Sequence, residues 1–181
     1  MKLLGEVHVG GDVAAFRACK YHVKRSARAI LLDAQGRVCV QNLRKEGFHM
    51  LPGGGIDPGE SIYDALKREV REEVGCDCEI IGELGMVLGS ENAECEEQIF
   101  LVDYCFVARV VGEIGSPRLE ADEAHSDTVS QWHDAEVVLA VIAGGRPNGY
   151  YVPMLRGQRT VERELVFLRE FILNFRQNCL Y

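Results

Sequence analysis

The chain has 181 residues, of which 47% are hydrophobic and 27% are charged. This balance is typical of one globular domain and excludes disordered, collagen-like and coiled-coil proteins. The 28 acidic and 20 basic residues give a net charge of −8, which repels nucleic-acid phosphates and anionic membranes. A protein that handles phosphates through a divalent metal is still compatible, because the metal inverts the local charge.

The N-terminal residues argue against export. In MKLLGEVHVGGDVAA, Glu6, His8 and Asp12 interrupt any apolar signal-peptide core. The longest apolar run near the C-terminus, Val137 to Ala143, is too short to span a bilayer. Seven cysteines, an odd count, fit reduced thiols. We therefore expect a cytoplasmic chain with no membrane partner.

The first half of the chain predicts strands followed by a helix. Residues 1–22 carry little pattern and are expected to form an extra strand or arm. SARAILLD and VCVQNLR, on either side of the turn AQGR, predict a hairpin. LPGGGIDPG is a glycine loop, and a helix is expected from about Ile62 to Val74. Ser61 is suited to cap its N-terminus, and Gly75 to end it.

The second half of the chain predicts more strands and a final helix. The segments CEIIGELGMVLG and QIFLVDYCFVARVVG predict strands on either side of the acidic residues 91–97. A second loop, residues 112–127, precedes a short strand around Trp132, an apolar segment over residues 135–143 and the turn GGRPNG. The last helix is expected to cover the core with one apolar stripe at intervals of four and three residues: Val161, Leu165, Leu168, Ile172 and Phe175.

The helix over residues 62–74 carries acidic residues where apolar ones are expected. Its stripe of Ile62, Leu66, Val70 and Val74 predicts one buried face. Three carboxylates lie on or beside that face, at spacings that let their head groups converge: Glu69, Glu72 and Glu73. Their repulsion requires a counter-charge, and oxygen ligands of this kind suit Mg²⁺ or Mn²⁺. The alternative is a solvated acidic face with Arg68 and Arg71 as local partners.

Residues 54–76 resemble the Nudix box, G-x5-E-x7-R-E-U-x-E-E-x-G-U, in which U is aliphatic. All fixed positions match: Gly54, Glu60, Arg68, Glu69, Glu72, Glu73 and Gly75. The one departure is Cys76 at the final aliphatic site, a packing position. The resemblance implies an α+β fold, a single-domain α/β/α sandwich around a mixed sheet, over residues 23–181. It also implies metal-dependent hydrolysis of a nucleoside diphosphate linked to another group.

The resemblance also assigns roles within the box. Glu72 and Glu73 correspond to metal ligands, and Glu69 to a ligand or to a general base acting through a bound water. Gly53 matches a position whose backbone carbonyl can bind the metal. Gly54, Gly75 and the pair formed by Glu60 and Arg68 are expected to be structural. The implied cofactor is Mg²⁺, with Mn²⁺ as a substitute.

A further metal-binding carboxylate is expected from a loop beyond the box. Glu120 is preferred, with Glu123 as its nearest alternative, because their loop leads into the strand around Trp132. The other candidates are acidic residues of the same loop and of the loop before it: Asp122, Glu94, Glu96 and Glu97. Any one of these acids could equally be a solubilising surface residue.

The substrate is not determined by the sequence. A modified nucleoside triphosphate, ADP-ribose and a nucleotide sugar are all compatible, and the expected partner is a small nucleotide, not a nucleic acid. Aromatic residues that could stack on a base, or belong to the core, are Tyr21, Phe48, Tyr104 and Trp132. A non-catalytic nucleotide sensor is the alternative to an enzyme, although such a domain would lack box carboxylates. Monomer and homodimer are both open.

Overall fold

The computed structural model describes residues 1–9, 20–91, 97–119, 121–149 and 152–176. Eight strands of these residues belong to one mixed sheet: β1 (Leu3–Val9), β2 (Lys20–Leu32), β3 (Val38–Leu43), β4 (Phe48–Met50), β5 (Gly53–Gly55), β6 (Asp77–Glu91), β7 (Glu97–Val111) and β8 (Thr128–His133). The helices are α1 (Ile62–Glu73), α2 (Ala121–His125), α3 (Ala135–Ala143), α4 (Met154–Glu170) and the π-helical segment η2 (Phe171–Phe175).

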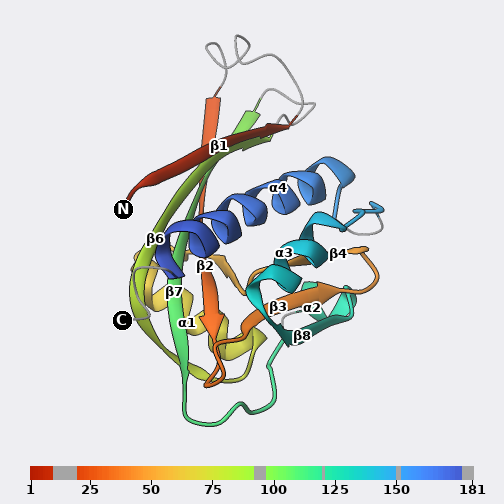
Figure 1. Cartoon of the computed structure of the whole chain (residues 1–181). Helices are drawn as coiled ribbons and strands as arrows, with labels where there is room; N and C mark the ends of the chain where they lie inside the picture. The colour runs from red at the N-terminus through yellow and green to blue at the C-terminus, as the bar shows by residue number, and fades with distance from the viewer. Residues whose placement is uncertain (10–19, 92–96, 120, 150–151, 177–181) are drawn as a thin grey trace.

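The sheet combines parallel and antiparallel pairs. Its main order is β1-β6-β7-β2-β3-β4, while β5 pairs with β2 and β8 pairs with β3. The β1–β6 and β2–β7 pairs are parallel, and the long β6–β7 pair is antiparallel. Figure 1 shows β2, β6 and β7 running the length of the molecule behind α4. Residues 3–9 thus form a strand of the sheet, and β2 begins at Lys20, before the expected boundary near residue 22.

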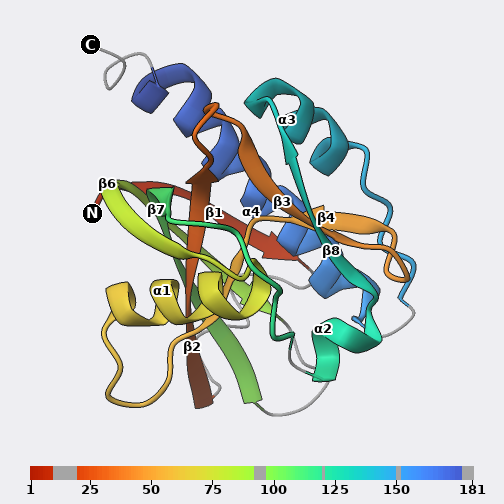
Figure 2. The same ribbon diagram turned by 90° about the horizontal axis from the view of Figure 1, so that it is seen from below.

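Helices cover both faces of the sheet, so the predicted sandwich is confirmed. Figure 2 shows α1 on one side and α3 with α4 on the other. On the α1 side, Leu66 and Val70 pack with alternate residues of β2, such as Ala29. On the α4 side, Phe167 and Leu168 pack with Ile30. The predicted stripe of the last helix is also confirmed, because all five of its residues belong to or contact this second core.

The predicted hairpin is correct only at its turn. Strands β2 and β3 are paired antiparallel at Leu32 and Val38 and then separate. The glycine segment β5 takes the place of β3 beside residues 26–28 of β2, while β3 pairs with β4 and β8. The sheet therefore splits between β2 and β3. Alternation of apolar residues predicts strands but not their partners, which explains the error.

The box helix begins and ends close to its predicted limits. Ser61 Oγ accepts a hydrogen bond from the backbone N–H of Asp64 at 3.1 Å, as expected of an N-cap. The helix ends at Glu73, one residue before the prediction, and Gly75 follows with φ +78°. None of the helices in the described ranges has the combined length and apolar character of a membrane span.

Candidate active site

Two glycines bring β5 into close contact with β2 and α1. Gly53 has φ +128°, and a Cβ there would lie 2.1 Å from the carbonyl oxygen of Ala27. A Cβ on Gly54 would lie 2.4 Å from Glu69 Oε1. Gly53 therefore does not accommodate a side chain, whereas a Cβ on Gly54 would displace the carboxylate of Glu69, against which the backbone of this segment lies.

The carboxylates of α1 differ in their burial. Glu69 and Glu73 are buried, sharing their face with Leu66 and Val70, whereas Glu72 is half-buried. The backbone N–H of Gly53 donates to Glu73 Oε2 at 2.6 Å. At the split in the sheet, Ser130 Oγ donates to the carbonyl oxygen of Glu73 at 3.3 Å. These contacts fix the C-terminal end of α1 beside β5.

Arg68 contacts three carboxylates at once. It forms a bidentate pair with Glu60, both N–O distances being 3.0 Å. Its Nη1 donates to Glu69 Oε1 at 2.8 Å and to Glu72 Oε2 at 3.1 Å. Its Nη2 also donates to the carbonyl oxygen of Gly55, so the expected pairing of Glu60 and Arg68 ties α1 to the glycine loop. These bonds, led by those to Glu60, raise the pKa of Arg68.

The α1 cluster (Glu60, Arg68, Glu69, Glu72 and Glu73) is short of positive charge. Burial raises the pKa of Glu69, and the guanidinium groups of Arg68 and Arg28 offset that effect only in part. Within the cluster, one guanidinium faces the carboxylates of Glu60, Glu69 and Glu72. A carboxylate buried with too little counter-charge favours the approach of a cation.

Arg28, which sequence reasoning missed, lies behind the glycine segment. It is buried on β2, and its Nη1 donates to the carbonyl oxygens of Gly53 and Leu51. Burial lowers the pKa of Arg28, and neighbouring Arg163 lowers it further. One signal was available in the sequence: Arg28 interrupts the apolar run from Ala27 to Leu32.

Two adjoining pockets open between the sheet and α4, and they share four lining arginines: Arg28, Arg156, Arg159 and Arg163. We call the two pockets the basic lobe and the apolar lobe of the α4 cleft. The basic lobe has a volume of about 560 Å³ and is bordered by β2 and residues 55–58. The apolar lobe has a volume of about 210 Å³ and reaches Glu73. The cleft thus meets the α1 cluster at Glu73.

A second charged cluster, the α4 cluster, consists of Ser26, Asp103, Arg159, Arg163 and Glu164 and is buried between the sheet and α4. Asp103 accepts from Arg159 Nη1 at 3.0 Å and from Arg163 Nη1 at 2.8 Å. Ser26 also donates to Asp103, and Arg163 is paired with Glu164. Burial alone would raise the pKa of Asp103, but the two arginines hold it at about 2.

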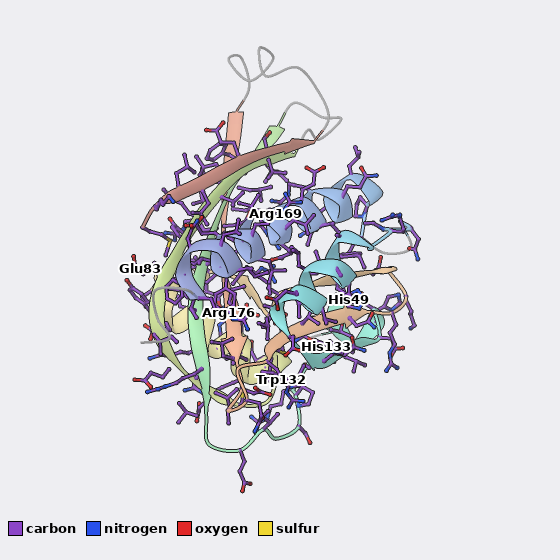
Figure 3. All side chains as sticks on the ribbon, viewed as in Figure 1. His49, Glu83, Trp132, His133, Arg169 and Arg176 are labelled. Carbon is purple, nitrogen blue, oxygen red and sulfur yellow. The ribbon has the colours of Figure 1, made fainter. Side chains whose placement is uncertain are left out.

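Of the four aromatic candidates, Phe48 lines the apolar lobe of the α4 cleft. Tyr104 and Trp132 pack against the core on the α1 side, and Trp132 lies well away from α4 in Figure 3. Tyr21 belongs to β2, but its side chain is outside the described residues. Met50 and Leu43, which were not candidates, complete the apolar wall around Phe48.

The loop carboxylates are not located by the structure. Glu120, Glu94 and Glu96 lie outside the described residues, as do the side chains of Glu97, Asp122 and Glu123. The described part of that loop does approach the box: the backbone N–H of Arg118 donates to the carbonyl oxygen of Glu72 at 2.6 Å. A third pocket, of about 580 Å³, lies between this loop and Glu72.

The donors around Gly53 fit a hard divalent cation in type, since they are carboxylates and a carbonyl oxygen. In the described ranges, no three His, Cys, Asp or Glu side chains are gathered closely enough to hold a metal. Glu69 and Glu72 converge on Arg68, while Glu73 is directed to the Gly53 amide. Gly53 binds Arg28 through its carbonyl oxygen, whose second lone pair can accept a further contact.

The comparisons with known proteins agree on one family. The NUDIX domain family model matches residues 22–153. The 8-oxo-dGDP phosphatase NUDT18 of Homo sapiens is 37% identical over 97 residues, 52% of this chain and 28% of that protein. The NAD-capped RNA hydrolase NUDT12 of Pongo abelii is 29% identical over 129 residues, 70% of this chain and 25% of that protein. The chain therefore spans between a quarter and a third of the length of these relatives.

A solved structure supports the same fold. The solution structure of the E. coli ORF135 protein has a TM-score of 0.55 and 16% identity, covering 94% of this chain and 100% of that one. At this identity the similarity concerns the fold alone. The family model, however, covers more than half of the chain and includes the whole box of residues 54–76. The chain belongs to the Nudix family.

Proposed function

We propose that the chain is a metal-dependent hydrolase of a diphosphate bond in a nucleotide. The observation that carries this proposal is the α1 cluster, in which buried carboxylates short of counter-charge lie beside an arginine-lined cleft. Nudix hydrolases generally use divalent metal ions. Mg²⁺ is the proposed ion here, with Mn²⁺ as a substitute, because both accept carboxylate and carbonyl oxygens.

Glu72, Glu73 and the carbonyl oxygen of Gly53 are the proposed ligands, and Glu120 is proposed to complete the site. Glu69 is either a further ligand or the base that accepts the proton of the attacking water. When bound, the cation neutralises diphosphate oxygens and lowers the pKa of that water. Arg28, at the wall of both lobes, binds phosphate oxygens of the substrate. Glu60 and Arg68 position α1 against the glycine loop.

Displacement at phosphorus depends mainly on positioning and charge stabilisation, so no nucleophilic side chain is needed. The buried cysteines are accordingly outside the mechanism. Cys76 packs in the core on the α1 side, and burial raises the pKa of its thiol to about 11. The catalytically silent alternative is disfavoured, since all three box carboxylates are present.

The proposed substrate is a small nucleotide, in a chain that acts in the cytoplasm. Relatives are named for 8-oxo-dGDP and for NAD-capped RNA, both of which contain a diphosphate. A modified nucleoside triphosphate is the first candidate for this chain. ADP-ribose or a nucleotide sugar is the alternative, and the apolar wall at Phe48 suits the nucleoside of any of them.

The test is a panel of nucleoside di- and triphosphates, ADP-ribose and nucleotide sugars, incubated with Mg²⁺ and analysed for the released products. Glu73→Gln and chelator-treated wild type serve as controls. We expect at least one nucleotide to be cleaved at a diphosphate bond, with turnover lost in both controls. Unchanged turnover after exhaustive chelation would contradict the metal-dependent mechanism. Absence of cleavage across the panel would instead favour a nucleotide-sensing role.

A further inference from the structure

The basic lobe concentrates positive charge on an acidic protein. The chain as a whole carries a net charge of −8. Two carboxylates, Asp57 and Asp103, line this lobe, together with six basic side chains: Lys24, Arg25, Arg28, Arg156, Arg159 and Arg163. A cleft lined by one sign of charge raises the local concentration of ligands with the opposite sign. The lobe therefore favours an anion.

Part of this charge serves the fold. Arg159 and Arg163 bind Asp103, and Arg163 is also paired with Glu164, so these two arginines and two carboxylates balance one another. Even so, the Nε atoms of Arg28 and Arg163 are buried without a hydrogen-bond partner among the described residues. Both side chains are at least nine-tenths buried and line the lobe. A buried guanidinium N–H without an acceptor is costly, and an anion in the lobe would stabilise the positive charge of these side chains.

The position of the lobe relates this anion site to the diphosphate. Arg28 lines both lobes and contacts the carbonyl oxygen of Gly53, whose N–H binds Glu73. The wall shared by the two lobes therefore adjoins the proposed scissile bond. The apolar lobe, with Phe48 and Met50, lies on one side of this wall and the basic lobe on the other. A substrate with its nucleoside in the apolar lobe directs its other end into the basic lobe.

We propose that the basic lobe binds a terminal phosphate at the non-nucleoside end of the substrate, with Lys24 and Arg156 as contacts at its rim. This inference rests on the proposed function, because it assigns the two ends of a nucleotide substrate. The phosphate belongs either to an oligophosphate chain or to a phosphorylated sugar.

The experiment measures binding to the full chain by calorimetry, in chelator and at low salt to limit screening. The probes are inorganic tripolyphosphate, ribose 5-phosphate and neutral ribose. The variants are Lys24→Gln and Arg156→Gln, both at exposed positions, so that folding is retained. Arg169→Gln is the matched control, because Arg169 is an exposed residue of the same helix (Figure 3) and does not line the cleft.

We expect at least one phosphate probe to bind more tightly than ribose. Its affinity should fall about tenfold in Arg156→Gln, the loss of one charge-assisted contact, and also fall in Lys24→Gln. Arg169→Gln should bind as the wild type does. If only tripolyphosphate binds, the terminal phosphate of the substrate belongs to an oligophosphate chain. If only ribose 5-phosphate binds, it belongs to a phosphorylated sugar. The proposal is overturned if neither phosphate binds better than ribose, or if Arg156→Gln binds like the wild type.

These results are separable from the proposed function, since binding is measured without metal. If the chain binds phosphate through Arg156 but cleaves no nucleotide, the phosphate site in the basic lobe is supported and the hydrolase proposal is contradicted. If the chain cleaves nucleotides but neither phosphate probe binds through Arg156, the hydrolase proposal is supported and the phosphate site in the basic lobe is contradicted.

Discussion

Two buried carboxylates on opposite sides of the sheet show opposite electrostatic responses. Asp103 is 2% exposed and Glu69 is 8% exposed, so burial disfavours the charge of both. Asp103 is bound by Arg159 and Arg163, and its pKa falls to about 2. Burial raises the pKa of Glu69. Arg68 offsets this effect only in part, because it is shared with Glu60 and Glu72. The opposite pKa shifts of Asp103 and Glu69 therefore follow from the number of cations available to each carboxylate and not from burial.

This difference distinguishes a structural carboxylate from one prepared for a ligand. Asp103 is satisfied by groups of its own chain, so we assign it to the stability of the fold. Glu69 and its neighbours are only partly satisfied, and a divalent cation would supply the missing charge. Removing the charge of Asp103 should therefore affect folding, and removing that of Glu69 should affect chemistry.

Asp103→Asn is expected to have the largest effect on stability. The substitution leaves two buried arginines without their shared anion, which costs about 3–5 kcal/mol when a buried pair is broken. Urea denaturation of wild type and variant measures the difference. Equal denaturation midpoints would place Asp103 outside the interactions that stabilise the fold.

The same pair of proteins gives a pH test. The pKa of Asp103 is about 2 in the folded chain and about 3.9 in an unfolded one. Its contribution to stability is thus complete above about pH 4 and is lost as the pH falls towards 2, a change of about 2 kcal/mol. We expect the stability difference between wild type and Asp103→Asn to shrink over that interval. A constant difference would contradict the lowered pKa.

Glu69→Gln should lower turnover by at least about a hundredfold, since it removes a charge from the proposed metal site. Its stability in chelator should be unchanged or raised, because burial disfavours the Glu69 charge. Turnover in saturating Mg²⁺ and melting temperature in chelator measure the two effects. A lower melting temperature with normal turnover would show that Glu69 stabilises the fold, as Asp103 does, and has no part in the chemistry.

Glu60→Gln is expected to act in the opposite sense. It breaks the bidentate pair with Arg68, which should cost about 1 kcal/mol of stability. Turnover should fall by less than in Glu69→Gln, because the role proposed for Glu60 is to position the helix through Arg68 and not to contact the substrate. The same two measurements apply. A loss of turnover equal to that of Glu69→Gln with unchanged melting would assign Glu60 to the chemistry.

Cys76→Val should have the smallest effect. Cys76 is buried in the α1-side core, so an apolar residue of similar size should change stability by less than about 1.5 kcal/mol. Turnover should equal that of the wild type. A large decrease in turnover with the fold intact would indicate a chemical role for the thiol.

Sequence reasoning located the elements whose signals are local. Helix α1 was bounded by Ser61 and Gly75, and the stripe from Val161 to Phe175 predicted the face that α4 and η2 pack on the core. It did not predict the split between β2 and β3, because strand partners depend on contacts distant in the sequence. The apolar segment of residues 135–143, left unassigned, is helix α3.

The α1 cluster could be proposed from one continuous motif, whereas the α4 cleft could not. Arg28, Asp103 and Arg163 are far apart in the sequence, and nothing in the sequence shows that they lie close together in the fold. Their positions offered a weak signal, since Arg28 and Asp103 interrupt apolar strands and Arg156, Arg159 and Arg163 follow helical spacing. Only the folded chain brings them together.

If the carboxylates of α1 hold a divalent cation, as we propose, the free protein should bind Mn²⁺, and measuring that binding is the most direct test. Electron paramagnetic resonance titration of wild type, Glu73→Gln and Glu162→Gln would compare one charge lost at the site with one lost at an exposed position of α4. We predict Mn²⁺ binding that is at least about tenfold weaker in Glu73→Gln and unchanged in Glu162→Gln. Equal affinity in all three proteins would contradict the account.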